Sequence, residues 1–196
     1  MKKACISVLF FFLTLSLMAQ EQSLPFAEIP PAPKHYDPAA VIARTVEGLG
    51  FRYYWASLDL RKEDLAYRPS EKGKSTLETL EHLYSLCETV FKISQNEPNI
   101  RPPQGIPKDY ISLRKETLLY LQKAAQTFRN MPTETMASLE VIFEIEGKKS
   151  SYPLWHLLNG PLADALYHTG QVVSFRRSSG NPIASGVNVF LGKKIP

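Results

Sequence analysis

The sequence predicts an all-α protein, an antiparallel four-helix bundle with a long crossover and a small β-hairpin before the last helix. Three observations lead to this fold class. Four segments repeat apolar residues with helical spacing, a Pro-rich stretch separates the second segment from the third, and one short run before the fourth alternates apolar and polar residues.

Composition and charge are those of an ordinary globular protein with one medium-sized domain. Of the 196 residues, 44% are hydrophobic and 21% are charged. Without Lys2 and Lys3, which lie in a segment expected to be removed, 21 basic residues stand against 19 acidic ones, a balance of +2. This weak charge, without any basic run, argues against nucleic acid or an anionic membrane surface as a partner.

The first 19 residues have the parts of a secretory signal peptide. Lys2 and Lys3 form the basic part, residues 6–17 are a nearly continuous apolar run, and cleavage is expected after Ala19. The apolar run is short for a transmembrane helix. We therefore expect an exported protein, periplasmic or extracellular, without stable membrane insertion after cleavage; the alternative is a retained N-terminal anchor.

Residues 20–37 contain four prolines and are expected to form a disordered or extended leader. Cys5 leaves with the signal peptide, so Cys87 is the one thiol of the mature chain and is expected to be buried.

The first predicted helix begins at Pro38, with Asp37 as its N-cap. Its apolar residues recur at alternating spacings of four and three, the pattern of a helix with one buried face. This seam consists of Ile42, Val46, Leu49, Tyr53, Ala56 and Leu60. Residues 61–73 are predicted as a polar loop.

The second predicted helix begins with the capping box of Ser75 and Glu78 and extends to about Gln95. His82 lies at the edge of its apolar arc, a position that suits either the rim of a groove or the plain surface. The main buried stripe of this helix consists of Leu77, Leu80, Tyr84, Cys87 and Phe91.

A Pro-rich stretch at residues 97–108 separates the second helix from the third and is long enough for a crossover. The third helix is predicted over residues 109–130. Arg114 falls on its apolar stripe and is expected to extend its charged head to solvent; the alternative is contact with an anionic ligand. The seam of this helix consists of Ile111, Leu118, Leu121, Ala125 and Phe128.

The last part of the bundle begins with a predicted hairpin. Residues 139–146 alternate as a strand does, and a return strand is expected at residues 150–152. The last helix is predicted over residues 153–178, kinked or interrupted at Pro161, which lacks a backbone donor. The bundle thus spans residues 38–180.

Residues 181–196 form a C-terminal tail, whose apolar cluster at residues 187–191 is expected to pack back on the bundle.

Asp164 and His168 are four residues apart in the last predicted helix, which places both on one face. Gln171 and Phe175 continue this stripe, which predicts that it faces the core. Polar groups there need partners, and a metal ion would satisfy a carboxylate and an imidazole together. From these residues alone, a structural hydrogen bond between Asp164 and His168 is the favoured alternative.

With these elements in place, the chain resembles the DinB-like (YfiT-type) family of metal-binding four-helix bundles over roughly residues 38–180. Three short motifs carry the resemblance, in the expected order and on the expected elements. They are YRPS at residues 67–70, LEHL at residues 80–83 and YHTGQV at residues 167–172.

The resemblance implies a divalent-metal site formed by one His of the second helix and an HxxxH pair of the last helix. His82 matches the first ligand and His168 the last, whereas Asp164 stands at the middle His position. Aspartate is a competent ligand, so the implied site has two imidazoles and one carboxylate. Zinc or nickel is the expected ion, with iron or manganese as further options. Alternatively, Asp164 marks a degenerate site.

Other polar residues have simpler explanations. Glu78 is accounted for by the capping box, and His156, twelve residues before His168, is about 18 Å away along a straight helix and cannot share its metal. Gln171 is either a partner that orients a ligand or a core amide.

Two hypotheses for function follow. One is an exported metal-dependent enzyme, of hydrolase or transferase type, acting on an unknown small-molecule substrate. The other is a non-enzymatic binding or scaffold bundle with a degenerate site. The sequence leaves a homodimer open.

Overall fold

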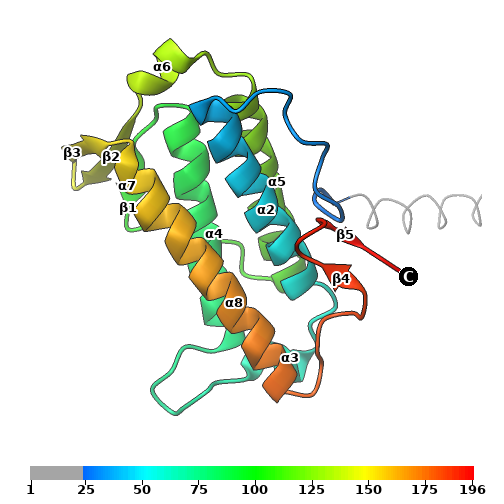
Figure 1. The fold of residues 1–196 in the computed structure, drawn as a ribbon. Coiled ribbons are helices and arrows are strands. Elements are labelled where there is room, and N and C mark those ends of the chain that lie inside the picture. The colour runs from blue at the N-terminus through cyan, green and yellow to red at the C-terminus, as the bar shows by residue number, and fades with distance from the viewer. Residues whose placement is uncertain (1–23) are drawn as a thin grey trace, which may run out of the picture.

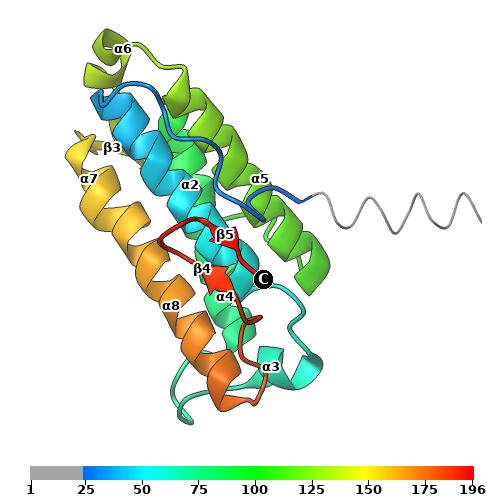
Figure 2. The same ribbon diagram turned by 45° about the vertical axis from the view of Figure 1, so that its right-hand side comes forward.

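The computed structural model describes residues 24–196 and is mostly helical, with a small sheet, as predicted. The predicted signal peptide, residues 1–19, lies outside the described residues. Four long helices lie side by side (Figures 1 and 2). They are α2 (Pro38–Ala56), α4 (Thr76–Ser94), α5 (Tyr110–Arg129) and α8 (Ala163–Ser178).

The long helices form a ring of contacts in which α5 lies between α2 and α4, and α8 closes the ring on the other side. The pairs α2/α5 and α4/α8 run antiparallel, but the predicted antiparallel arrangement does not hold for the other two neighbouring pairs. The pairs α4/α5 and α2/α8 run parallel: Gln95 at the end of α4 bonds to Thr127 near the end of α5, and Arg176 near the end of α8 bonds to Ala56 at the end of α2. The crossover at residues 97–108 produces the parallel pairs. It carries the chain from the end of α4 back to the end of the bundle where α4 begins, so that α5 runs in the same direction as α4.

The helices begin where their capping residues predict. Asp37 accepts a hydrogen bond from the Ala40 N–H at 2.8 Å, and Asp109 accepts one from the Ser112 N–H at 2.8 Å. The capping box is complete at α4, where the Ser75 N–H donates to Glu78 at 2.7 Å. Each cap satisfies a backbone donor that has no partner within the helix.

Most residues of the predicted seams lie in the core, but Leu77 and Phe91 of the second helix are only half-buried, and Leu83, Val90 and Ile93 are fully buried there instead. All six seam residues of the first helix are buried, and so is Cys87. Ile111 is 56% exposed because it lies in the first turn of α5, beyond the packed part of the helix. Arg114 is buried rather than extended to solvent: its guanidinium donates to the Tyr54 carbonyl and to Ser57 Oγ, both at 3.2 Å. The free carbonyls at the end of α2 provide this partner inside the protein.

The sheet is larger than the predicted hairpin. Strands β2 (Glu140–Ile145) and β3 (Lys148–Pro153) pair antiparallel, and the short strand β1 (Asn99–Arg101) adds a parallel partner to β2. Two short helices, α3 (Lys62–Ala66) and α6 (Thr133–Ala137), also have no counterpart in the predicted elements. Helix α3 corrects the prediction of a loop over residues 61–73.

Pro161 interrupts the last helix, as predicted. The short helix α7 (Trp155–Leu157) leads into a kinked turn, η1 (Leu158–Leu162), and α8 follows. Gly160 leaves the helical conformation there, with ψ at −107°. The turn shifts the helical register directly before Asp164, the first acidic residue of α8.

The leader begins with a turn near Phe26 and packs on the bundle only in part, since Tyr36 is 97% exposed. Phe26 is buried against Gly50, and the Ile29 N–H donates to the Gly192 carbonyl at 2.7 Å. The tail forms a small hairpin of β4 (Val187–Asn188) and β5 (Lys193–Lys194). The prediction that its apolar cluster packs on the bundle is wrong, since Phe190 is 93% exposed: the tail contacts the leader through Gly192 instead.

Within residues 24–196, no helix combines the length and the apolar composition needed to cross a membrane.

Candidate metal centre

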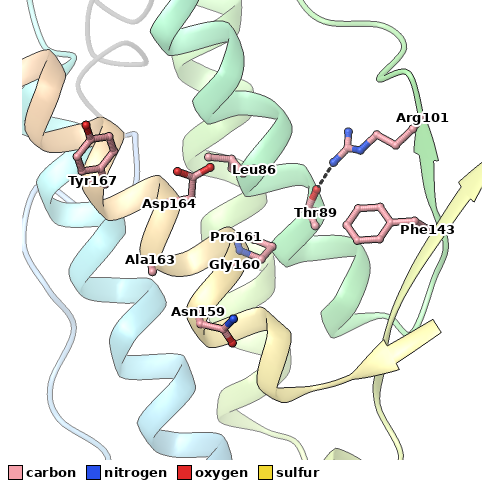
Figure 3. A pocket seen from close by; sticks show the side chains of 10 residues that line it. All are labelled: Leu86, Thr89, Arg101, Phe143, Asn159, Gly160, Pro161, Ala163, Asp164 and Tyr167. Carbon is pink, nitrogen blue, oxygen red and sulfur yellow. Dashed lines mark hydrogen bonds between the residues drawn. The ribbon is translucent and has the colours of Figure 1, made fainter. Parts of the chain in front are cut away.

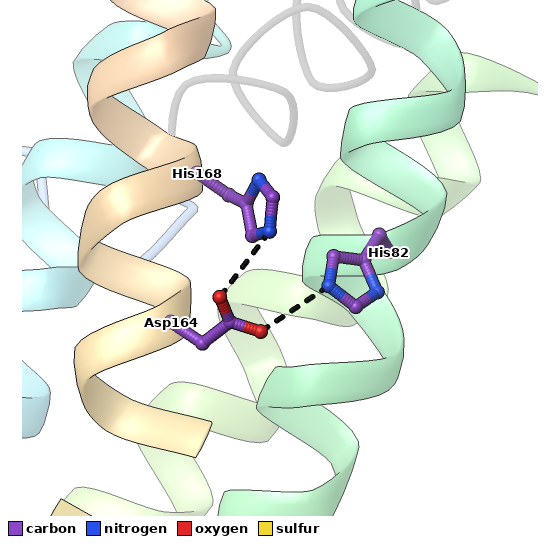
Figure 4. A group of neighbouring side chains, drawn as sticks. All are labelled: His82, Asp164 and His168. Carbon is purple, nitrogen blue, oxygen red and sulfur yellow. Dashed lines mark hydrogen bonds and ion pairs between the residues drawn. The ribbon is translucent and has the colours of Figure 1, made fainter. Parts of the chain in front are cut away.

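His82, Asp164 and His168 meet between α4 and α8. His82 projects from α4, whereas Asp164 and His168 lie on successive turns of α8, and the three side chains point toward one another (Figure 4). One potential ligand atom from each residue lies within 4.8 Å of the others. The structure therefore brings together the three residues that the motifs selected. We call them the metal cluster.

The start of α4 fixes the position of His82. Arg68 donates to both oxygens of the Glu78 carboxylate, at 2.7 and 3.0 Å, while Glu78 accepts from the Ser75 N–H. These bonds, that with Arg68 foremost, lower the pKa of Glu78 to about 2. Glu78 is thus committed to the cap rather than to the metal cluster, and His82 follows one turn later on a well-anchored helix.

The turn η1 sets the direction of α8, and with it the direction in which Asp164 and His168 project. Pro161 carries no N–H and Gly160 is non-helical, so the regular hydrogen-bond ladder is broken just before Asp164. The kink at Gly160 separates the direction of α8 from that of α7. Beyond the turn, α8 is regular and holds Asp164 and His168 four residues apart on one face.

The Asp164 carboxylate lies between the two imidazoles. Its Oδ2 is 3.3 Å from His82 Nε2, and its Oδ1 is 3.3 Å from His168 Nε2. On the far side of the second ring, His168 Nδ1 is 2.7 Å from Gln171 Oε1. Donation by Nδ1–H to Gln171 leaves Nε2 of a neutral ring with a lone pair facing the carboxylate. Two acceptors so placed need a cation between them, either a proton or a metal ion.

This donor set fits a divalent metal ion. Two imidazole nitrogens and one carboxylate oxygen are suitable ligands for zinc and for several transition metals. Metal-binding histidines usually have a hydrogen-bond partner on the ring nitrogen that does not bind the metal. Gln171 is such a partner for His168, in agreement with the first of its two predicted roles, that of orienting a ligand.

The metal cluster is half-buried. The side chains of His82, Asp164 and His168 are 32%, 43% and 16% exposed. Burial lowers the pKa of His82, the charge of Lys74 adds to this, and Asp164 partly opposes it. The imidazole is thereby favoured in the neutral form that binds metal.

The prediction that the Asp164 stripe faces the core needs correction. The fully buried residues of α8 lie one position further round the helix, at Ala165, Thr169, Val172 and Arg176. These mostly small residues let α8 pack closely on its neighbours. Asp164, His168 and Gln171 consequently lie at the rim of the α4/α8 interface, where a ligand can reach them.

A cavity of about 500 Å³ opens beside the metal cluster, and Asp164 belongs to both. Its walls come from α4, from the sheet and from the turn η1 (Figure 3). The residues that line it are Leu86, Thr89, Arg101, Phe143, Asn159, Gly160, Pro161, Ala163, Asp164 and Tyr167. Sequence analysis did not identify Arg101 as a site residue, because strand β1, which carries it, lies in a Pro-rich stretch without strand periodicity.

The two remaining histidines lie away from the metal cluster. His156 is exposed and lies edge-on to the Tyr152 ring, with 5.5 Å between the ring centroids. His35 is exposed in the leader.

Comparison with known proteins places this geometry in context. No model of a known protein family matches the chain, and no curated protein is similar to it in sequence. The structure is similar to the crystal structure of a DinB-like protein, YjoA, from Bacillus subtilis, with a TM-score of 0.53, covering 71% of this chain and 92% of that chain. The chain has a DinB-like fold. The two sequences are 16% identical, so the DinB-like likeness is one of fold, and it confirms at that level what the three motifs suggested.

Proposed function

We propose that this chain is an exported four-helix bundle of DinB-like type that binds a divalent metal ion at His82, Asp164 and His168. We further propose that it is a metal-dependent enzyme, of hydrolase or transferase type, acting on a small molecule. One observation carries the proposal: three ligand atoms from two helices lie within 4.8 Å of one another, beside a cavity of about 500 Å³.

Zinc or nickel suits the two imidazoles and the carboxylate, with iron and manganese as further options for a site of two histidines and one acid. When bound, such an ion supplies Lewis acidity that polarises an oxygen of the substrate. The protein's own residues do the rest. Gln171 holds the His168 ring in one orientation, and Leu86 and Phe143 give the adjoining cavity apolar walls that suit an apolar part of a substrate.

The second candidate function is a binding or scaffold module in which Asp164 joins α4 to α8 by hydrogen bonds. The contacts of Asp164 with both histidines favour it. However, both are 3.3 Å, longer than the 2.7–2.9 Å typical of charge-assisted hydrogen bonds. The half-exposure of Asp164 also makes it a weak link between helices. These features support a ligand site more than a structural bond.

Metal titration tests the proposal. Wild-type protein is expected to bind zinc or nickel with one site per chain, and His82→Ala and Asp164→Ala are expected to weaken binding by at least about tenfold. His156→Ala is the matched control, because His156 is an exposed histidine away from the metal cluster, and its affinity should equal that of wild type. Wild-type protein that binds no metal ion would support the scaffold function instead.

Catalysis needs its own test. Metal-loaded protein is assayed on ester, amide, phosphoester and thiol-transfer substrates, with Asp164→Ala as the comparison. Turnover that is lost on chelation and in Asp164→Ala supports the enzyme, whereas tight metal binding without any turnover across this panel supports a binding module.

Export is a separate proposal that rests on residues 1–19. N-terminal sequencing of the native protein should begin near Gln20. A chain that retains Met1 and sediments with the membrane fraction would contradict it.

A further inference from the structure

Arg101 occupies an unusual position for an arginine in this molecule. It ends strand β1, and its side chain reaches the wall of the cavity that also contains Asp164 (Figure 3). Its Nη2 donates to Thr89 Oγ1 of α4 at 2.5 Å, and the guanidinium carbon lies 5.7 Å from the centroid of the Phe143 ring on β2. Two different elements therefore hold the guanidinium in place.

The charge of Arg101 has no ion-pair partner within residues 24–196. Arg61, Arg68 and Arg129 each pair with a carboxylate, and the buried Arg114 and Arg176 donate to backbone carbonyls. These five arginines are satisfied by partners within the protein.

A guanidinium has several N–H donors in a fixed plane. For Arg101, the bond to Thr89 is the one interaction of these donors with another described residue. Glu88 of α4 is near enough to act on the charge of Arg101 but forms no ion pair with it. Burial disfavours this partly unpaired cation and lowers its pKa, so an incoming anion would restore interactions that the protein does not provide.

We propose that Arg101 is the anion-binding residue of this cavity, and that the substrate of the metal site carries a carboxylate or phosphate group. The statement about the substrate rests on the proposed function, whereas anion binding by Arg101 does not. The guanidinium fork matches two oxygens of either group. Leu86, Phe143 and Pro161 line the same cavity as Arg101 and Asp164 and suit a short apolar part of the substrate.

The geometry thus assigns two ends to the substrate. Its anionic group lies at Arg101, and its reacting group lies at Asp164, where the cavity meets the metal cluster. Thr89 acts as a positioning residue, since its hydroxyl accepts from Arg101 and fixes the direction of the guanidinium.

The test is a calorimetric titration of the full mature chain with inorganic phosphate and, separately, with butyrate, in metal-free and zinc-loaded form. Arg101→Met keeps the aliphatic stem and removes the charge. It is expected to weaken binding of the preferred anion by about tenfold or more in both forms. Arg101→Lys, which keeps the charge but not the fork, should lie between Arg101→Met and wild type. Phosphate and butyrate together show which class of anion the cavity prefers.

Two controls separate this inference from the proposed function. Arg177→Met removes an exposed arginine of α8 and should leave anion binding unchanged. Zinc affinity should be the same in Arg101→Met and wild type, because Arg101 is not a ligand.

The possible outcomes are distinct. If wild-type protein binds no metal but binds an anion through Arg101, the metal function fails and the anion site stands. If the anions bind Arg101→Met as tightly as wild type, or bind wild type not at all, the inference is overturned whatever the metal does. Circular dichroism of each variant verifies that the helices are intact.

Discussion

Two polar regions of the molecule use similar residues in opposite ways. The first, which we call the end network, joins the end of α2 to the end of α8. Arg176 is only 3% exposed and donates to the carbonyls of Trp55, Ala56 and Leu58 at 2.9–3.1 Å. Nearby, the buried Asp64 accepts from Arg61, Ser179 and Asn181, at distances from 2.6 to 3.0 Å.

The metal cluster contrasts with the end network in each of these respects. His82 and Asp164 are about one-third or more exposed, and the bonds of Asp164 are 3.3 Å long. The end network has many short bonds around the buried Asp64 and Arg176, as groups that bind chain segments together do. The metal cluster is open on one side and incompletely bonded. The polar residues of the metal cluster are thus less buried and less tightly bonded than those of the end network, a difference that supports the proposed ligand site.

The largest expected effect is in the end network. Arg176→Met leaves four carbonyls without this donor, the fourth being that of Asn181, so we expect a loss of about 3–5 kcal/mol in the free energy of unfolding. The neighbouring Arg177→Met removes an exposed arginine and should change stability by less than about 0.5 kcal/mol. Urea titration followed by circular dichroism measures both. If both variants lost the same free energy of unfolding, the end network would be no more important for stability than an ordinary surface.

Core substitutions set the scale against which both polar regions are judged. Leu49 and Leu121 are fully buried, on α2 and α5. Leu→Ala at either position is expected to cost about 2–5 kcal/mol, because the lost burial adds to the cost of the cavity left behind. A loss below about 1 kcal/mol in the same titration would show that these helices do not pack as the structure has them.

Acid should weaken the end network through Asp64. The hydrogen bond from Arg61, with those from Ser179 and Asn181, holds the pKa of this buried carboxyl well below its usual range. A depressed folded-state pKa stabilises the protein above the unfolded value, near 3.9, and the stabilisation is lost as the pH falls from there toward the folded value.

In that acidic range the unfolded chain binds one more proton than the folded chain at Asp64. The stability of wild type should therefore fall more steeply than that of Asp64→Asn, by about 1.4 kcal/mol per pH unit. Urea titrations at several pH values between about 4 and 2 measure the two slopes. Parallel slopes would show that Asp64 is not held ionised by the network.

Much of the fold followed from the sequence because its signals are local. The caps at Asp37, Ser75 and Asp109 gave the starts of three long helices, and Pro161 marked the interruption of the last one. Strand β1 could not be predicted, because its three residues pair with β2, more than forty residues away, and have no periodicity of their own. Distant pairings of this kind depend on the tertiary fold rather than on local propensity.

The candidate site likewise has residues that could be predicted from local sequence and residues that could not. The spacing of Asp164 and His168 and the edge position of His82 were readable along single helices. Arg101 and Phe143 reach the cavity from a sheet that forms only in the folded chain. The destination of Arg114 was misjudged for a related reason: its partners, the carbonyl of Tyr54 and the hydroxyl of Ser57, belong to a different helix end.

Among the substitutions in the two polar regions, those in the metal cluster are expected to change stability least. His82→Ala and Asp164→Ala should change the unfolding free energy of the metal-free protein by less than about 1 kcal/mol, since the bonds lost are long and half-exposed. Losses like that of Arg176→Met would mean that the cluster is structural after all.

Asp164→His sharpens the same comparison. It supplies a third imidazole at the position where the resembled family has one, and it should keep or raise the affinity for zinc. A metal titration of both proteins decides the point. Zinc binding gained by Asp164→His, with none in wild type, would identify the natural site as degenerate.

The most direct test of the central claim is a crystal structure of the zinc-loaded wild-type chain, with the ion located by its anomalous scattering. The account predicts a single strong peak between α4 and α8, about 2.0–2.2 Å from one ring nitrogen each of His82 and His168 and from one Asp164 oxygen. At least one coordination position should face the cavity that contains Arg101. A peak elsewhere, or none with Asp164 still bonded to both histidines, would contradict the account.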